Sequence, residues 1–233
     1  QTLFPPGEGT VFAIAGSAPT ASTTVIVGNA APVVSAVTLN NAASIVLTAN
    51  ATTAVNVNAT ITDNNGCGDI NNGTTTIMVY RSAITSSTCL TTANNLNCYR
   101  LTDFTASSTC SASAKNTTTT FGIYYFAQAT DASSSFAAQN WLATVIFKDP
   151  AAATGTADSS GVELLTLTAL DVTTSSINYG TLSASSTTGS TNQNATGTNA
   201  GNSSTTLRLS ANSTLTSGSN SISTSSQRYS TSS

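Results

Sequence analysis

The stretch from Ala54 to Arg81 has the pattern of a strand, a turn and a second strand, and apolar and polar residues alternate in its first part. Four apolar residues occupy every second position, with Asn and Thr between them: Val55, Val57, Ala59 and Ile61. This period of two is typical of a half-buried β-strand. The turn-forming run Asp63-Asn64-Asn65-Gly66 ends this strand, and after a second polar break at Asn71-Asn72-Gly73 the segment Thr74 to Arg81 has the β-branched and aromatic residues of another strand. The two segments predict the central strand pair of a β-sandwich.

The same pattern predicts further strands along the chain. They lie at Thr10–Ala15, Ser22–Val27, Pro32–Leu39, Ile45–Thr48, Phe121–Ala127, Trp141–Phe147 and Val162–Leu170. The strands that begin at Phe121 and Trp141 hold most of the aromatic residues and should form the core. The polar stretch from Ser82 to Thr120 is too long for an ordinary hairpin connection. The strands that begin at Thr10 and Ser22 have no obvious local partner, so each should add to a sheet in this subunit or in another.

Large apolar residues become sparse after residue 170. Short alternating runs at 176–182, 191–198 and 205–211 still predict strands, but they offer too few apolar side chains to offset the entropy of ordering. This part should be disordered or complete its core with something from outside. The fold class is therefore all-β, with an N-terminal strand arm over 1–30, an Ig-like β-sandwich over 31–170 and a smaller, incomplete β-domain over 171–233. The pattern at 227–233 resembles a strand cut off midway, so we expect the gene product to continue.

Polarity comes from uncharged groups. Only 6% of the residues are charged, whereas 35 serines and 45 threonines make up about a third of the chain. The net charge is −3 and the six Lys and Arg residues are scattered, which argues against nucleic-acid binding. The apolar runs are too short for a transmembrane segment. A surface with so little charge offers little electrostatic opposition to packing against its own copies.

Four cysteines at 67, 89, 98 and 110 allow three disulfide pairings. We prefer Cys89–Cys98, which closes a short loop, and Cys67–Cys110, which ties the long polar connection back to the sandwich. A metal site is the rival interpretation, but no Cys-x-x-Cys spacing is present. The chain opens on Gln1, as if a signal peptide had been removed. With the cysteines, this opening favours a secreted, extracellular or cell-surface location.

Seven Asn-x-Ser/Thr sequons are possible glycosylation sites. They are Asn50, Asn58, Asn72, Asn116, Asn194, Asn202 and Asn212. The sequence has many Asn and Thr residues, so several sequons arise by chance. We expect some of them to carry sugar if the source cell has the machinery.

The sequence argues against an enzyme. It has no histidine, which removes Ser-His-Asp and Cys-His catalysis and the commonest zinc ligand. Glu8 and Glu163 are its two glutamates, and no carboxylate pair for glycoside hydrolysis is evident. No cofactor is expected.

Two further groups of residues could bind a ligand, and each also has a simpler interpretation. Asp63, Asn65 and Asp69 could offer oxygen ligands to a structural calcium ion, although an ordinary turn explains the same residues. Trp141 with the Tyr124-Tyr125 pair could form a sugar-binding platform. The alternation favours the other interpretation, in which Trp141 and one tyrosine are core residues.

Several short phrases are turn signals: Ala31-Pro32-Val33-Val34-Ser35, Thr62 to Ile70, Tyr80-Arg81-Ser82, Asn97-Cys98-Tyr99, Ala129-Thr130-Asp131-Ala132 and Thr198 to Asn202. Through them the chain resembles the Ser/Thr/Asn-rich, Ig-like surface proteins predicted in uncultivated prokaryotes, over roughly residues 31 to 233. The resemblance implies a secreted cell-surface β protein. In layout, an N-terminal strand ahead of a β-domain that lacks one, the chain is also similar to donor-strand filament subunits.

The function expected from these observations is that of a surface filament subunit. The donor strand would be Thr10, Val11, Phe12, Ala13, Ile14 and Ala15, with Ser22–Val27 as second choice. It would pair with a sheet edge of the next copy, and Val11, Phe12 or Ile14 would fill a gap in that copy's core. The alternatives are a monomeric adhesin or carbohydrate-binding module and a surface-layer lattice protein.

Overall fold

The computed structural model describes residues 8–12, 22–105, 109–183, 185–188, 193–208, 210 and 213–226. Regular structure in these residues is mostly β-strand in antiparallel sheets, which confirms the all-β class. The described helices are short: α1 (Cys67–Asn72), α2 (Ser86–Thr91), η1 (Asn40–Ala42) and η2 (Thr224–Ser226). None of them has the length and apolar character needed to cross a bilayer.

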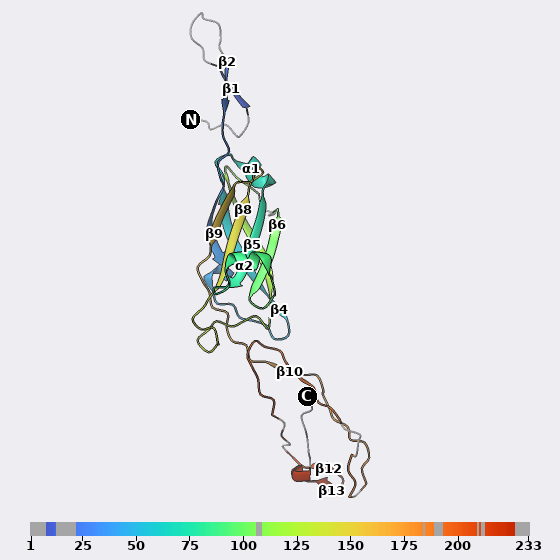
Figure 1. The fold of residues 1–233 in the computed structure, drawn as a ribbon. Coiled ribbons are helices and arrows are strands. Elements are labelled where there is room, and N and C mark those ends of the chain that lie inside the picture. Colours follow the sequence, from blue (N-terminus) through green and yellow to red (C-terminus); the bar gives the residue numbers. More distant parts are fainter. Residues whose placement is uncertain are drawn as a thin grey trace, which may run out of the picture.

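Two sheets form a sandwich (Figure 1). One has the order β3-β4-β7, with β3 at Val33–Leu39, β4 at Thr52–Thr62 and β7 at Ala114–Tyr124. The other has the order β6-β5-β8-β9, with β6 at Cys98–Phe104, β5 at Thr74–Arg81, β8 at Trp141–Lys148 and β9 at Thr154–Asp158. The predicted pairing of β4 with β5 is therefore wrong. Both are inner strands, but each belongs to a different sheet, because α1 carries the chain from one sheet to the other.

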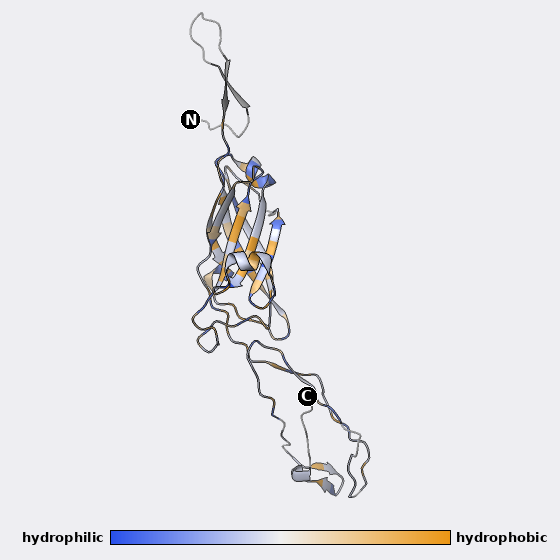
Figure 2. Cartoon of the chain, viewed as in Figure 1, coloured by the Kyte–Doolittle hydropathy of each residue, from blue (hydrophilic) through white to orange (hydrophobic). Residues whose placement is uncertain are grey.

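The core lies between the two sheets. The predicted alternation holds on β4, where all four inward residues are at most 4% exposed. Trp141 on β8 is fully buried, and its indole Nε1 donates to the carbonyl of Gln128 at 2.9 Å. Its ring lies 5.9 Å from that of Tyr99, and burial raises the pKa of Tyr99 to about 12. Figure 2 shows the hydrophobic residues concentrated on these sandwich strands.

Several predicted boundaries in the sandwich are wrong. Ile45–Thr48 and Val162–Leu170 are not strands in the structure. They run past each other and form one parallel bridge between Ile45 and Leu164, both fully buried. The long polar connection contains α2, β6 and the first half of β7. Strand β9 was missed because its sequence, Thr-Gly-Thr-Ala-Asp, carries no large apolar residue.

The arm is a hairpin. β1 (Glu8–Phe12) pairs antiparallel with β2 (Ser22–Ile26), so the expectation that these strands lack a local partner is wrong. Donor residues Ala13, Ile14 and Ala15 lie outside the described residues. In Figure 1 the arm leaves one end of the sandwich, and the segment from residue 170 onward, called the tail here, extends from the other end.

The tail holds two small ribbons. β10 (Leu170–Val172) pairs with β11 (Gly197–Asn199), and β12 (Leu215–Ser217) pairs with β13 (Asn220–Ile222). The strand predicted at 176–182 is wrong, and the described part of the one predicted at 205–211 is not a strand either. The one predicted at 191–198 overlaps β11 alone, because in the described residues no further strand pairs with the β10-β11 ribbon to extend the alternation into a longer strand.

Both disulfides have the pairing preferred from the sequence. Cys67–Cys110 attaches α1 to the segment before β7, with 5.6 Å between the Cα atoms. Cys89–Cys98 attaches α2 to β6 over the outer face of β5, with a Cα separation of 5.5 Å. Disulfides are typical of proteins outside the cytosol.

Of the two disulfides, Cys67–Cys110 should contribute more to the free energy of unfolding. Because Cys67 and Cys110 are 43 residues apart, chain entropy predicts that C67A/C110A lowers the free energy of unfolding by about 4 kcal/mol in guanidinium titrations. Adding dithiothreitol to this variant breaks the remaining bridge, whose separation is 9 residues, and should lower it by about 2.7 kcal/mol more. A larger loss in the second step than in the first would contradict the prediction.

Candidate functional site

The arm joins the sandwich through a set of side-chain hydrogen bonds. Asn29 Nδ2 donates to Asp149 Oδ2 at 2.8 Å. The backbone N–H of Ala30 donates to Asn65 Oδ1 at 2.6 Å, and Asn65 Nδ2 donates to the carbonyl of Gly28 at 3.4 Å. The last three residues of the arm are therefore fixed to two loops at one end of the sandwich, which we call the arm junction.

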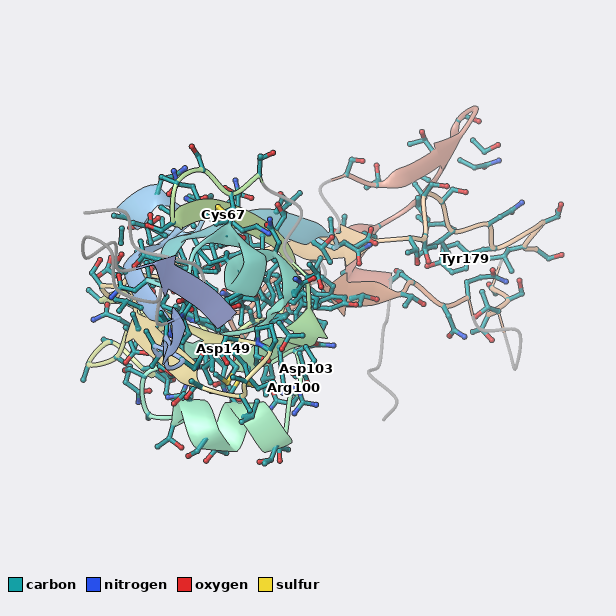
Figure 3. The ribbon with its side chains drawn as sticks, turned by 90° about the horizontal axis from the view of Figure 1, so that it is seen from above. Cys67, Arg100, Asp103, Asp149 and Tyr179 are labelled. Carbon is teal, nitrogen blue, oxygen red and sulfur yellow. A yellow bond between two sulfur atoms is a disulfide. The ribbon has the colours of Figure 1, made fainter. Side chains whose placement is uncertain are left out.

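Three carboxylates meet at the arm junction. Asp63 follows β4, Asp69 lies on α1 and Asp149 follows β8, and one oxygen of each lies within 4.8 Å of the other two. Figure 3 looks onto this end and labels Asp149. Asp63 and Asp149 are buried and Asp69 is half-buried. Burial and the charges of Asp63 and Asp149 raise the pKa of Asp69.

Local turns hold each carboxylate in place. Asp63 Oδ1 accepts from the backbone N–H of Asn65 at 2.8 Å, in a turn that ends at Gly66 with a φ of 92°. Asp149 Oδ1 accepts from the N–H of Ala153 at 2.8 Å in the β8–β9 hairpin. Helix α1 is anchored at its first residue by the disulfide to Cys110 and by buried Ile70. The junction therefore concentrates negative charge on rigid supports.

The sequence located part of this cluster. Asp63 and Asp69 come together as the calcium hypothesis required. Asn65 is used differently, because its side chain bonds the arm, and the third carboxylate comes from Asp149. Asp149 was missed because it belongs to the other sheet. The local signal available was an Asp-Pro turn directly after a strand.

The tail exposes its apolar residues. Eight of them have between 37% and 54% of their surface exposed: Leu170, Val172, Ile177, Tyr179, Leu182, Leu207, Leu215 and Ile222. Among the described residues after 170, Ala200 and Gly201 alone are buried. The described part of the tail is therefore a β-structure without a closed core, in agreement with its composition.

A turn at Asn199–Asn202 attaches the tail to the sandwich. Asn202 Oδ1 accepts from the N–H of Leu167 at 2.6 Å. Asn202 Nδ2 donates to the carbonyls of Ala127 at 3.0 Å and Leu165 at 3.2 Å. Gly201 is required here, because a Cβ atom would collide with the carbonyl of Leu167. The sequence Asn199-Ala200-Gly201-Asn202, part of the turn signal from Thr198 to Asn202, forms this turn.

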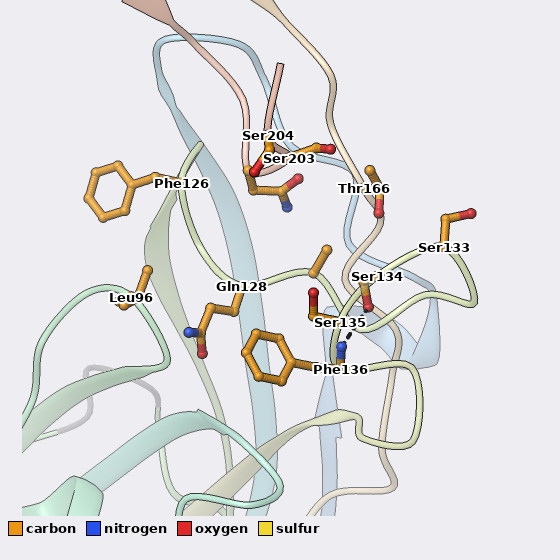
Figure 4. Close-up of a pocket in the computed structure, with 12 residues that line it drawn as sticks. Leu96, Phe126, Gln128, Ser133, Ser134, Ser135, Phe136, Thr166, Ser203 and Ser204 are labelled. Atoms are coloured by element: carbon orange, nitrogen blue, oxygen red, sulfur yellow. Dashed lines mark hydrogen bonds between the residues drawn. The ribbon is translucent and has the colours of Figure 1, made fainter. Parts of the chain in front are cut away.

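A shallow cavity of about 430 Å³ lies at the tail end of the sandwich (Figure 4). Its wall includes Phe126 and Phe136, and the Arg81 guanidinium stacks on Phe136 at 3.9 Å. Next to it, the rings of Tyr124 and Phe126 stack at 5.1 Å and are 37% and 38% exposed. The sugar-platform hypothesis fails for Trp141, which is buried, but this exposed aromatic pair offers such a surface.

The sequon asparagines differ in whether their amide nitrogen is free. The Nδ2 atom of Asn50 donates to Asp171, and that of Asn58 donates to Thr38 and Asn41. The Nδ2 atom of Asn72 donates to the carbonyl of Gly68, and that of Asn202 donates to two sandwich carbonyls. Asn116 is exposed and uses its Oδ1 to accept from Thr60 at 2.8 Å, which leaves Nδ2 toward solvent. Asn194 is also exposed, and Asn212 lies outside the described residues.

Glycan occupancy should follow these environments. In a host that glycosylates sequons, we expect sugar on Asn116 and Asn194 and none on Asn202, because a glycan on Asn202 would break its two hydrogen bonds to the sandwich. Glycopeptide mass spectrometry measures this site by site. Sugar on Asn202 with a bare Asn116 would contradict the expectation.

Comparison of the chain with protein-family models, with curated proteins and with solved structures finds no match.

Proposed function

We propose that the protein is an extracellular structural protein, the repeating subunit of a surface filament, with an Ig-like sandwich as its central domain. The described part of the tail exposes eight large apolar side chains and has no closed core, and this observation is the main support for the proposal. An arm that already has β-structure leaves the opposite end of the sandwich. The arm of one subunit would complete the tail of the next.

The contact between subunits would form by β-strand addition. In the described residues, each strand of the two tail ribbons pairs on one edge alone, so backbone N–H and C=O groups remain for an added strand. Thr10–Ala15 is the first candidate donor, and Val11 or Ile14 would enter the apolar gap. Since β1 already pairs with β2, the hairpin either adds its free edge or exchanges one strand for the tail.

The tail is a better acceptor than the β7 edge of the sandwich. The sandwich strands β3, β6, β7 and β9 are also paired on one edge in the described residues. However, the inward face of the first half of β7 is polar, with buried Lys115 and Thr117, so a donor strand would find no apolar gap there. Full burial of an exposed Leu or Ile contributes about 1.5–3 kcal/mol, and the tail side chains, which are already about half-buried, would gain about half of that. The tail therefore gains more from a donor than the β7 edge does.

Such a contact is head-to-tail and does not close on itself, so it builds a fibre. The low charge of the chain supports this role, because adjoining copies would repel each other weakly. The lack of histidine in the sequence agrees with a non-catalytic structural role. The proposed subunit would also carry covalent glycans on exposed asparagines.

Deleting residues 1–28 should abolish polymerisation. The deletion removes both arm strands but keeps Asn29 and Ala30, which bond the sandwich, so the sandwich should still fold. Light scattering and negative-stain electron microscopy should show monomers where the whole chain forms filaments. Filaments from the deleted protein would rule out strand donation by the arm.

A single charge in the tail should have the same effect. Leu215 and Ile222 face each other across β12 and β13 and are 44% and 41% exposed. L215D should leave the monomer folded, since Leu215 is not in a closed core, but it should block fibre growth because an added strand would bury an unpaired carboxylate. T216D, one residue along and on the other face, is the matched control and should polymerise. Equal growth of both variants would contradict the tail as acceptor.

The exposed pair Tyr124 and Phe126 beside the cavity favours one alternative, a carbohydrate-binding adhesin. An adhesin would stay monomeric and lose saccharide binding in Y124A. A surface-layer protein would form sheets in the same electron micrographs.

A further inference from the structure

One oxygen at the arm junction has no hydrogen-bond partner. Asp63 Oδ2 is buried, and it is the one carboxylate oxygen among the buried, unpartnered side-chain atoms of the described residues. The side chain is 2% exposed, so water does not solvate this oxygen well. A buried anionic oxygen without a donor is strongly unfavourable unless a proton or a cation compensates it.

No basic side chain compensates the cluster. The one ion pair among the described residues joins Lys148 to Asp103 at 3.7 Å, and both of these side chains are exposed. Lys148 is the neighbour of Asp149 in sequence, but its ammonium group is engaged with Asp103. Asp63, Asp69 and Asp149 therefore face one another without a positive partner in the described structure.

The geometry fits one cation. Protein oxygens bind calcium at about 2.4 Å, so two ligands on opposite sides of an ion lie about 4.8 Å apart. All three carboxylates satisfy that limit at once. Asp69 is half-buried, so the site is open on one side and water can fill the remaining coordination positions. A shared proton would neutralise one carboxylate and leave the other two in repulsion.

We propose that Asp63, Asp69 and Asp149 bind one calcium ion, and that this ion fixes the base of the arm on the sandwich. Calcium prefers six to eight oxygen ligands in a flexible arrangement, whereas magnesium keeps most of its water and usually takes one or two carboxylates. The ion connects β4, α1 and the β8–β9 hairpin. Through Asp149, which accepts from Asn29, it also holds the arm.

The consequence for the arm follows from its hydrogen bonds. Asn29 and Ala30 are bonded to Asp149 and Asn65, which lie in the two loops that would carry the ion. Without the ion, repulsion among the carboxylates loosens both loops and the arm with them. With the ion, the arm leaves the sandwich in a fixed direction. The site is thus a calcium-dependent joint between two parts of the chain.

Thermal unfolding with an Asp69 variant tests the site. The Asp69 side chain makes no hydrogen bond to a described residue, so D69N removes a ligand without removing a structural contact. We expect 10 mM calcium to raise the melting temperature of the wild type by about 3 to 10 °C over EGTA. D69N should lose this response, and in EGTA it should melt above the wild type because one repulsive charge is gone. D103N, which removes an exposed carboxylate, should respond as the wild type does.

Two further measurements make the result decisive. Isothermal titration with calcium chloride should give a dissociation constant of about 0.1 to 1 mM, in the range of extracellular modules. Hydrogen exchange of the Ala30 amide should slow at least about tenfold with calcium, while that of the Asn202 amide, at the other end of the sandwich, should not change.

The proposal is overturned if calcium does not raise the melting temperature, if D69N responds as much as the wild type, or if magnesium at the same concentration has the same effect. It is also overturned as an arm joint if calcium binds but the exchange of Ala30 is unchanged. All readouts are taken within one chain, so they do not depend on whether the protein forms filaments.

Discussion

One face of β4 is buried against the facing sheet, and this apolar contact holds the two sheets of the sandwich together. Charge contributes little, because a single exposed ion pair is present among the described residues. The apolar side chains of the two sheets form one contiguous core, and that core holds most of the fully buried residues. The arm and the tail lie outside it. Their order must come from local hydrogen bonds, from the arm junction and the Asn202 turn, or from another molecule.

The pattern of apolar residues predicted what depends on local sequence. Alternation located β4 and β8 almost to the residue, because one face of each packs on the core. Alternation did not predict the features that depend on contacts with residues far away in the sequence. Nothing in the sequence of β4 and β5 shows that they belong to opposite sheets. The segment Val162–Leu170 reads as a strand, yet its Leu164 reaches the core through one bridge to Ile45.

At the two ends of the molecule, too, the sequence predicts the local features and not those that depend on distant residues. The incomplete core of the tail could be read from composition, since too few large apolar residues follow residue 170. The arm junction could be read in part. Asp63 and Asp69 are six residues apart and meet through a turn and a short helix, whereas Asp149 arrives from the other sheet. A cluster assembled from two loops and a short helix is a property of topology, and a single sequence does not reveal it.

The outer face of the β3-β4-β7 sheet shows how a weakly charged surface can still be ordered. Thr118 donates to Asn58 at 2.8 Å, Thr120 donates to Asn56 at 2.7 Å, and each pair spans directly opposite positions on β4 and β7. Neutral pairs of this kind satisfy each other without ions, so this face does not depend on pH or salt. The arm junction is the opposite case, with three carboxylates packed together. In a chain with so few charges, that concentration makes the junction the place where ionic conditions can act on the structure.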